Sequence, residues 1–156
     1  MFRKMRLGKK GLSQDQAWQV LEKAHYGVLA VLGDSGYPYG VPVQYVVMNK
    51  AIYIHCAKQG HKLDAIAAEP KVCFTAVSDM QILADDFNTA FHSAVAFGKA
   101  ALLEDEQEIL AALWKIFEKY TPDHLEAAKD YLADNLAATA VIKITVDHLT
   151  GKAKEV

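Results

Sequence analysis

Short apolar runs separated by polar turns dominate the sequence. Runs that are rich in Val, Ile, Tyr and Phe and are bounded by Gly, Asn, Asp or Ser are typical of β-strands. Six runs predict strands: Tyr26–Leu32, Tyr39–Met48, Ala51–Ala57, Lys71–Val77, Thr89–Leu103 and Thr139–Val146. Residues 78–88 are polar and acidic, and they predict a loop or a ragged strand. The residues after Val146 are expected to form a tail.

Four other segments carry apolar residues at the spacing of an amphipathic helix. The first begins at Ser13, where Gln16 three positions later completes a capping box, and it ends near Ala24. Pro122 suits the first turn of the last helix. The remaining helices are expected at His61–Ala68, at Asp105–Tyr120 and from Thr121 to about Leu136.

Successive strands joined by tight turns form antiparallel pairs. About six such strands in 156 residues close most economically as a small barrel, with helices against its outside or over its ends. The predicted fold is therefore mainly β, within the α+β class. Residues 1–156 contain no repeat, low-complexity tract or linker, so a single domain is expected.

Pro42 lies within the second predicted strand and lacks the N–H that a sheet ladder requires. One side of this strand is therefore expected to be an unpaired edge. Such an edge is either a simple boundary of the sheet or a row of backbone groups that bonds the polar rim of a ligand. Pro42 alone favours the simpler alternative.

Charge and composition exclude several classes of partner. The formal net charge is −2, from 17 basic and 19 acidic residues, so no broad basic surface is available for nucleic acid. Met1–Lys10 is basic but has no apolar signal-peptide core, and no apolar run reaches membrane-spanning length. A cytoplasmic protein without a membrane partner is therefore expected. Neither CxxC nor HExxH spacing is present, so Cys56 and Cys73 are expected to be free thiols and no metal site is expected.

The segment from Lys58 to Lys62 combines the features of a phosphate-binding site. It joins a predicted strand to a predicted helix, and Gly60 allows backbone N–H groups to approach a ligand closely. Lys62 adds a mobile positive charge. A lysine beside a helix start is also commonly just solvated, and these residues alone leave the two interpretations evenly balanced.

Several segments together resemble one known family. They are Met1–Arg6, GDSGYPYGVPV, YIHCAKQGHKLDAI, Val95–Gly98, Leu103–Glu106 and His148–Lys152. The pattern is similar to the FMN-binding split-barrel proteins related to pyridoxamine 5'-phosphate oxidase, and most of all to their nitroimidazole resistance (Nim) branch. The similarity extends over nearly the whole chain. The C-terminal tryptophan and arginine with which the oxidase holds its pyridoxal substrate are missing, which argues against pyridoxamine phosphate as the substrate.

The resemblance implies a split barrel that forms a homodimer, with FMN at the subunit interface. It implies that the flavin ring follows the second strand and that the phosphate lies near the third strand and the helix after it. The implied cofactor-binding residues are Val41, Pro42, Val43, Gln44, His55, Cys56, Gly60, His61, Lys62 and Ser93. His61 replaces an arginine of the oxidase, which weakens the phosphate clamp because a neutral histidine carries no fixed charge. The small residues of Ala94–Ala100 are expected to pack against the second subunit.

Two histidines are candidates for the functional histidine that Nim proteins carry beside the flavin. His55, on the same strand face as Tyr53, is the catalytic candidate and is expected to titrate near neutral pH. A lone strand histidine is more often a core group, and the sequence leaves open whether His55 or His61 fills the functional role. Cys56 and Cys73 have no evident activating base and are expected to be packing residues.

Two functions agree with these residues. The first, which we favour, is an FMN-dependent oxidoreductase of the Nim type. It would pass electrons from a reduced nicotinamide, NADH or NADPH, to a small nitroaromatic or related acceptor. The second is a non-catalytic protein of the same fold that binds a flavin or haem for sensing or carriage.

Overall fold

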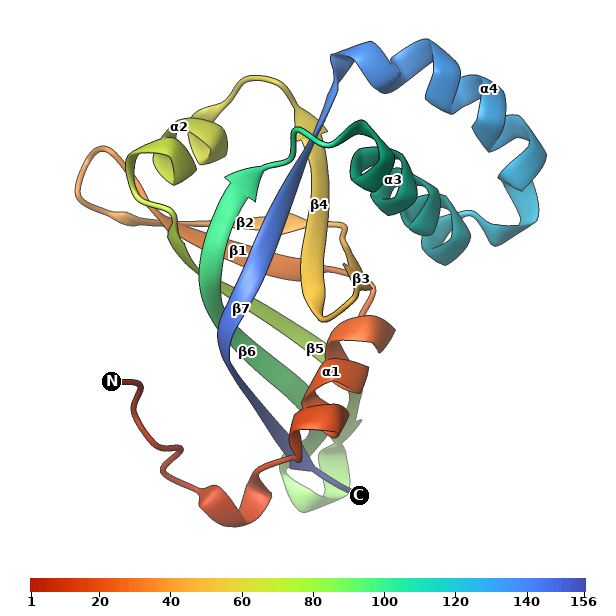
Figure 1. The fold of residues 1–156 in the computed structure, drawn as a ribbon. Coiled ribbons are helices and arrows are strands. Elements are labelled where there is room, and N and C mark those ends of the chain that lie inside the picture. Colours follow the sequence, from red (N-terminus) through yellow and green to blue (C-terminus); the bar gives the residue numbers. More distant parts are fainter.

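A twisted antiparallel sheet of seven strands forms the centre of the molecule (Figure 1). The structure is a computed structural model that describes all residues from Met1 to Val156. The strands are β1 (Gly27–Leu32), β2 (Pro38–Val43), β3 (Val46–Met48), β4 (Ala51–Ala57), β5 (Lys71–Leu83), β6 (Asn88–Leu102) and β7 (Thr139–Lys154). The α-helices are α1 (Gln14–Lys23), α2 (His61–Ala68), α3 (Glu106–Tyr120) and α4 (Leu125–Asn135). Short 3-10 helices occur at Gly8–Lys10, Ala84–Asp86, Pro122–His124 and Leu136–Ala138.

The order of the strands across the sheet is β2-β1-β5-β6-β7-β4-β3. Neighbouring strands are all antiparallel, and the two outermost strands, β2 and β3, do not pair with each other. The predicted split barrel with flanking helices is confirmed, but it has seven strands rather than six and its sheet is not closed. The expectation of a closed barrel is wrong, because β2 and β3 follow one another in the chain but lie at opposite edges of the sheet and do not pair.

The predicted single strand Tyr39–Met48 is wrong in one respect. The strand stops at Val43 and resumes at Val46, so that Gln44 and Tyr45 carry the chain from one half of the sheet to the other. β2 pairs only with β1, and β3 pairs only with β4. The unpaired edge that Pro42 predicts is therefore confirmed.

Tyr45 is held in place at this crossing by hydrogen bonds and by burial of its side chain. Its backbone N–H donates to the hydroxyl of Tyr120 on α3 at 3.1 Å, and Lys119 Nζ donates to its carbonyl oxygen at 3.2 Å. Its side chain is fully buried, and its hydroxyl donates to the carbonyl of Leu21 on α1. Burial lowers the pKa of Lys119 to about 8 and raises the pKa of Tyr45. Helix α3 thus replaces the ladder bonds that Tyr45 gives up.

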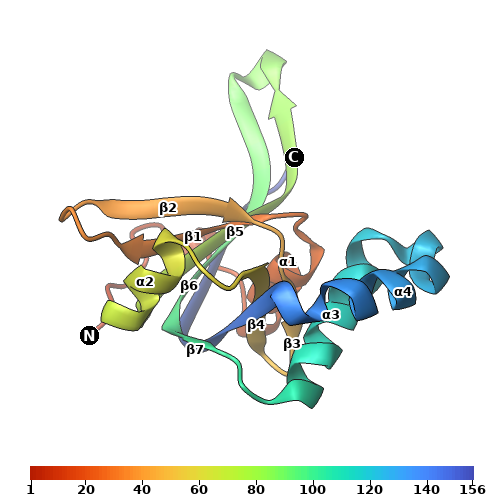
Figure 2. The ribbon, with the colours of Figure 1, turned by 90° about the horizontal axis from the view of Figure 1, so that it is seen from above.

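Residues 78–88 continue β5 as an irregular strand and turn into β6, so the ragged strand, one of the two predicted alternatives, is confirmed. β5 continues to Leu83 and pairs with β6 as far as Asn88, with a bulge between Ser78 and Gln81. Asp79, inside that bulge, has a φ of 53°, which places it in the left-handed region. The ends of the two strands project from the rest of the molecule (Figure 2). The predicted tail after Val146 is likewise part of a strand, because β7 pairs with β6 as far as Lys154.

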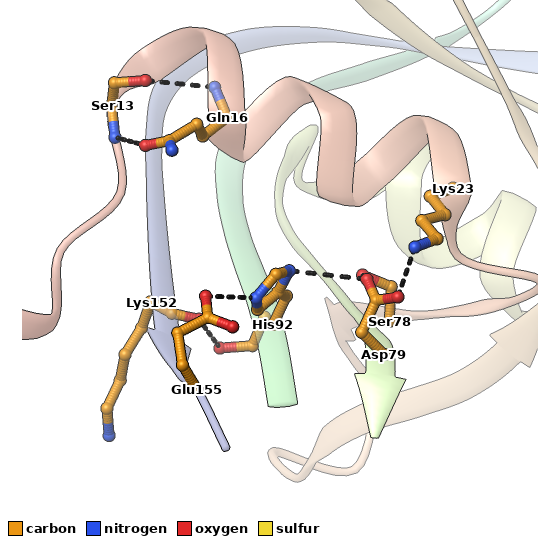
Figure 3. Close-up of polar contacts among 9 residues, drawn as sticks. Ser13, Gln16, Lys23, Ser78, Asp79, His92, Lys152 and Glu155 are labelled. Carbon is orange, nitrogen blue, oxygen red and sulfur yellow. Dashed lines mark hydrogen bonds and ion pairs between the residues drawn. The ribbon is translucent and has the colours of Figure 1, made fainter. Parts of the chain in front are cut away.

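Two apolar clusters form the core. The larger one lies between the sheet, α1 and α2, and the smaller one lies between α3 and the strands β3, β4 and β7. The capping box of α1 is confirmed: Ser13 Oγ accepts the N–H of Gln16, and Gln16 Oε1 accepts the N–H of Ser13 (Figure 3). On α3, Glu108 binds both the Tyr53 hydroxyl and Lys143 Nζ at 2.6 Å, which fastens the helix to the sheet.

The small residues of β6 pack within the chain itself. Ala94, Ala96 and Ala100 are buried in the larger core cluster. A Cβ added to Gly98 would lie 2.3 Å from the carbonyl oxygen of Thr145 on β7. The close approach that these residues permit is therefore to neighbouring elements of the same subunit, and the expectation that Ala94–Ala100 packs against a second subunit is wrong for its three buried alanines.

Replacement of Tyr120 by Phe should destabilise the protein, because it removes hydrogen bonds at the crossing between β2 and β3. The change removes the hydroxyl that accepts the Tyr45 N–H and donates to the His25 carbonyl at 2.7 Å. Loss of a partner for such backbone groups costs about 1–3 kcal/mol, measurable by urea unfolding. Tyr131→Phe is the matched control, because the Tyr131 hydroxyl lies on an exposed side chain of α4. Equal stability of the two variants would contradict the role of Tyr120.

Candidate functional site

The start of α2 presents free donors to solvent. Gly60, at the N-cap, has a φ of 145°, and its carbonyl accepts the N–H groups of Leu63 at 3.0 Å and Asp64 at 3.2 Å. The N–H groups of His61 and Lys62 have no backbone carbonyl as partner. A Cβ added to Gly60 would meet nothing within 4 Å, so the approach to these donors is open. This arrangement is suited to an anion.

The end of β4 lies within reach of the charge on Lys62. The pKa of His55 is lowered, mainly by burial of the ring and further by the positive charge of Lys62. The pKa of Cys56 is raised by burial, and Lys62 opposes this effect. His55 is therefore neutral at pH 7, and Cys56 is a protonated thiol that packs against the larger core cluster. His55 is itself an exposed residue at the end of β4, so its titration stays a prediction, with a pKa below the ordinary value.

His61 takes a different direction from its neighbour Lys62. Its ring stacks on Tyr39 of β2, with 4.4 Å between ring centroids and 20° between planes. Its Nε2 lies 3.8 Å from Asp34 Oδ1 in the turn between β1 and β2. The side chain of His61 thus fastens α2 to the β1–β2 hairpin, while its backbone N–H remains at the anion-binding end of the helix.

The open edge of β2 leads into a cavity beneath α3 and α4. Val41 and Val43 are half-buried against the larger core cluster, and Pro42 between them is exposed. Gln44, the next residue, and His55 both line a cavity of about 380 Å³ whose remaining walls come from α3, α4 and the turn between them. The structure therefore brings Gln44, which follows β2, together with His55 and the α3–α4 pair in one region.

Ser93 is not part of this region within one chain. It pairs with Lys152 on β7, whereas His55 pairs with Val141 on the same strand. The twelve residues from Val141 to Lys152 span roughly 35 Å of extended strand. The hydroxyl of Ser93 donates to the carbonyl of Lys152 at 3.4 Å.

A separate polar cluster surrounds this end of the sheet (Figure 3). Asp79 forms an ion pair with Lys23 of α1 and accepts the Ser78 hydroxyl at 2.8 Å. His92 lies between Asp79, at 3.4 Å, and Glu155, at 2.8 Å. These contacts fasten α1 and the end of β7 to the β5 bulge, and we assign the cluster a structural role.

Comparison with known families agrees with the fold and the motifs. Residues 13–153 match the model of the family described as pyridoxamine 5'-phosphate oxidase. The chain belongs to this family. The predicted relationship to pyridoxamine 5'-phosphate oxidase is thereby confirmed. No curated protein matches the sequence significantly.

Members of this fold among solved structures include several flavoproteins. A protein named for 5-nitroimidazole antibiotic resistance, from Bacteroides thetaiotaomicron, has a TM-score of 0.74 and 24% identity, with 93% of this chain and 90% of that chain covered. The flavocytochrome Anf3 of Azotobacter vinelandii has a TM-score of 0.83 and 19% identity, with 99% and 73% covered. An FAD-binding protein of Mesorhizobium loti has a TM-score of 0.70 and 23% identity, with 93% and 97% covered. At these identities the likeness shows a shared fold.

The residues of this family member fit FMN at two points. The open donors at the start of α2 together with Lys62 suit a phosphate, and the unpaired edge of β2 beside them suits the polar rim of a flat ring. The walls that α3 and α4 contribute, among them Phe117 and Tyr131, were not predicted as part of a site. They lie more than 60 residues from His55, and their helical spacing gives no signal beyond ordinary amphipathicity.

Neither a cluster of potential metal ligands nor a membrane-spanning helix is found in the structure. No group of three or more His, Cys, Asp and Glu side chains is placed to hold a metal ion. Every helix falls short of the length and apolar character that crossing a bilayer requires.

Removal of the Lys62 charge should raise the pKa of His55 in the flavin-free protein. Lys62→Met leaves burial as the main cause, so the pKa should rise but stay below the ordinary value of 6.5. Lys58→Met, two residues before Gly60, is the control and should leave the pKa of His55 unchanged. The measurement is an NMR titration of the His55 ring. An equal response to both variants would contradict a specific effect of Lys62.

Proposed function

We propose that this protein is an FMN-binding oxidoreductase that reduces small nitroaromatic or related acceptors. The observation that carries the proposal is the meeting of Lys62, His55 and unpaired helix N–H groups beside the open edge of β2. The chemistry that bound FMN supplies is acceptance of hydride from NADH or NADPH and delivery of electrons to the acceptor. The FAD-binding protein of the same fold, named above, supports a flavin as the cofactor.

The phosphate is the group that the chain is best equipped to hold. Lys62 contributes a positive charge, and the N–H groups of His61 and Lys62 contribute donors at the positive end of the α2 dipole. The backbone of Val41–Val43 and the side chain of Gln44 are available to the polar rim of the ring. Gly60 keeps the path to the phosphate clear.

His55 is the residue that we assign to proton transfer. It lies between the charge of Lys62 and the α3–α4 cavity, and its ring is neutral at pH 7. A neutral ring offers one donor to an acceptor oxygen, and its protonated form is a stronger donor on the acid side. His61 is the weaker candidate, because its ring is engaged with Tyr39 and lies close to Asp34.

We also propose a homodimer that completes the flavin site. Ser93 reaches such a site only from a second subunit, given its separation from His55 along β7. The projecting hairpin carries exposed apolar side chains, Val77, Met80, Ile82 and Phe87. An exposed apolar patch of this kind is typical of a protein contact. The interface is thus proposed at the hairpin, where the sequence had indicated the alanines of β6.

Lys62→Ala should weaken FMN binding while sparing riboflavin, which lacks the phosphate. A charge-assisted bond to phosphate contributes about 1.5–3 kcal/mol, which corresponds to a loss of roughly ten- to a hundred-fold in affinity. Fluorescence titration of the flavin-free protein measures both ligands. Lys58→Ala should change neither affinity. Equal losses of FMN and riboflavin binding in Lys62→Ala would assign Lys62 to the fold instead.

His55→Ala should retain FMN but lose most NADPH-driven reduction of 4-nitrobenzyl alcohol. Because the protonated ring is the stronger donor, wild-type turnover should rise as the pH falls through the His55 pKa, which lies below 6.5. This rise should be missing in His55→Ala. A pH–rate profile of the two flavin-loaded proteins measures it.

The same assay separates the catalytic proposal from a carrier. A yellow wild-type protein whose flavin neither NADH nor NADPH bleaches would support a non-catalytic flavin-binding function. Unchanged turnover in His55→Ala would show that the flavin reaction does not depend on His55. Identification of the cofactor by mass after heating the purified protein distinguishes FMN from FAD or haem.

A further inference from the structure

A second cavity beside α3 lies apart from the proposed flavin site. Its volume is about 420 Å³, within the range of roughly 300–1,000 Å³ that is common for ligand pockets. β3 contacts both α1 and α3 and lies between them in Figure 1. These three elements line the cavity with Glu22, Val46, Val47, Lys115, Glu118 and Lys119. None of these residues lines the cavity of Gln44 and His55 or is among those that we assign to FMN, so any function of this cavity is separate from flavin binding.

Lys119 has unusual surroundings for a lysine. Its side chain is half-buried, and its Nζ lies 4.1 Å from the centroid of the Tyr45 ring and 5.3 Å from that of the Tyr120 ring. It donates a hydrogen bond to the Tyr45 carbonyl at 3.2 Å. No carboxylate forms an ion pair with Lys119. The amine is therefore taken out of water next to aromatic rings and receives no paired negative charge in return.

These surroundings favour the neutral, nucleophilic form of the Lys119 amine. Burial lowers the pKa of Lys119 to about 8, and the negative charge of Glu22 partly opposes this effect. Near pH 7, roughly a tenth of such an amine is neutral, against less than about 0.1% for an ordinary lysine with a pKa of about 10.4. A desolvated lysine of this kind is the usual nucleophile for carbonyl compounds. Lys115, one turn earlier on α3, lines the same cavity but is exposed and lies over no aromatic ring.

The charges of the lining favour an uncharged electrophile. When Lys119 is neutral, the lining carries the positive charge of Lys115 and the negative charges of Glu22 and Glu118. A negatively charged acyl donor or aldehyde would meet a net negative lining, whereas an uncharged aldehyde would not be repelled. Val46 and Val47 of β3 provide apolar surface for a short alkyl chain.

We propose that Lys119 binds small uncharged aldehydes covalently, as a reversible Schiff base. The Nζ lone pair forms a bond to the carbonyl carbon, and the carbonyl oxygen leaves as water with two of the three protons of the ammonium form. The products are a protonated C=N bond and water, so the step requires neither an oxidant nor a reductant. The proposal does not depend on the flavin.

The contacts of Lys119 agree with this adduct. The protonated Schiff base keeps one N–H, which is sufficient for the hydrogen bond to the Tyr45 carbonyl. It also keeps its positive charge over the Tyr45 ring. The crossing of the chain is therefore preserved in the adduct, and addition of water reverses the reaction.

The test is reductive labelling of the purified protein with propanal and sodium cyanoborohydride near pH 7. The reductant converts the Schiff base to a stable secondary amine, which mass spectrometry of the peptides assigns to each lysine and, separately, to the N-terminal amine. Lys119 should be labelled at least about tenfold faster than Lys115, because a larger share of it is neutral. Lys119→Arg keeps a donor and a charge for Tyr45 but no nucleophile. It should lose the fast labelling while its urea unfolding shows that it stays folded.

A second pair of variants tests the surroundings of Lys119 without changing the amine. Glu22→Gln removes the charge that opposes the effect of burial, so the pKa of Lys119 should fall further and its labelling near pH 7 should become faster. Glu126→Gln, exposed on α4 and outside the cavity, is the matched control and should label as the wild type does. Glyoxylate, a negatively charged aldehyde, should label Lys119 more slowly than propanal does, each rate being divided by that of free Nα-acetyllysine.

Three results would overturn the inference. Equal labelling of Lys119 and Lys115, or fast labelling that persists in Lys119→Arg, would show that Lys119 is not the reactive amine. An identical rate in Glu22→Gln and the wild type would contradict the electrostatic control of Lys119. Relative labelling by glyoxylate that equals or exceeds that by propanal would contradict the preference for an uncharged aldehyde.

Discussion

The crossing at Gln44 and Tyr45 is the constraint on which the rest of the structure depends. Two residues leave the sheet ladder in a partly buried position, and each unpaired backbone group there costs about 1–3 kcal/mol. Tyr120 and Lys119 of α3 satisfy the N–H and the carbonyl of Tyr45. The crossing leaves β2 as an open edge and brings Gln44 to the same cavity as His55. The split that makes room for a ligand thus depends on a helix that follows much later in the chain.

The sequence predicts elements whose signals are local, and it misses features that depend on distant partners. The bounds of β4 and α2 agree with the prediction because strand-forming residues, Gly60 and Pro70 mark them along the chain. The break at Tyr45 carries no such mark, because tyrosine is a good strand former and its partner Tyr120 lies 75 residues away. The full extent of the hairpin at residues 78–88 could not be predicted for a similar reason. Asp79, in the left-handed region, interrupts the alternation of apolar and polar residues, and the strand continues only because it pairs with β6.

The candidate site divides in the same way. Lys62, His55 and Cys56 are close in the sequence, and the strand-to-helix turn keeps them close in space. The direction of the His61 side chain could not be predicted, because it depends on Tyr39 and Asp34 in another hairpin. The aromatic walls from α3 and α4 follow from helix packing alone. The lowered pKa of His55 depends first on desolvation by the surrounding structure, which the local sequence does not show, and then on the charge of the nearby Lys62.

The placement of α3 and α4 has a consequence for how this protein can diversify. β6 and β7 are neighbours in the sheet, with Leu102 paired to Ile142, so the two helices form an excursion that leaves one strand and returns to the next. Changes in the length or sequence of α4 leave the strand register untouched, and they alter the α4 wall of the cavity without altering the sheet. Helix α3, in contrast, hydrogen-bonds to the backbone of Tyr45 through Tyr120 and Lys119, so changes in α3 affect the crossing. Sequence variation is therefore expected to be tolerated better in α4 than in α3.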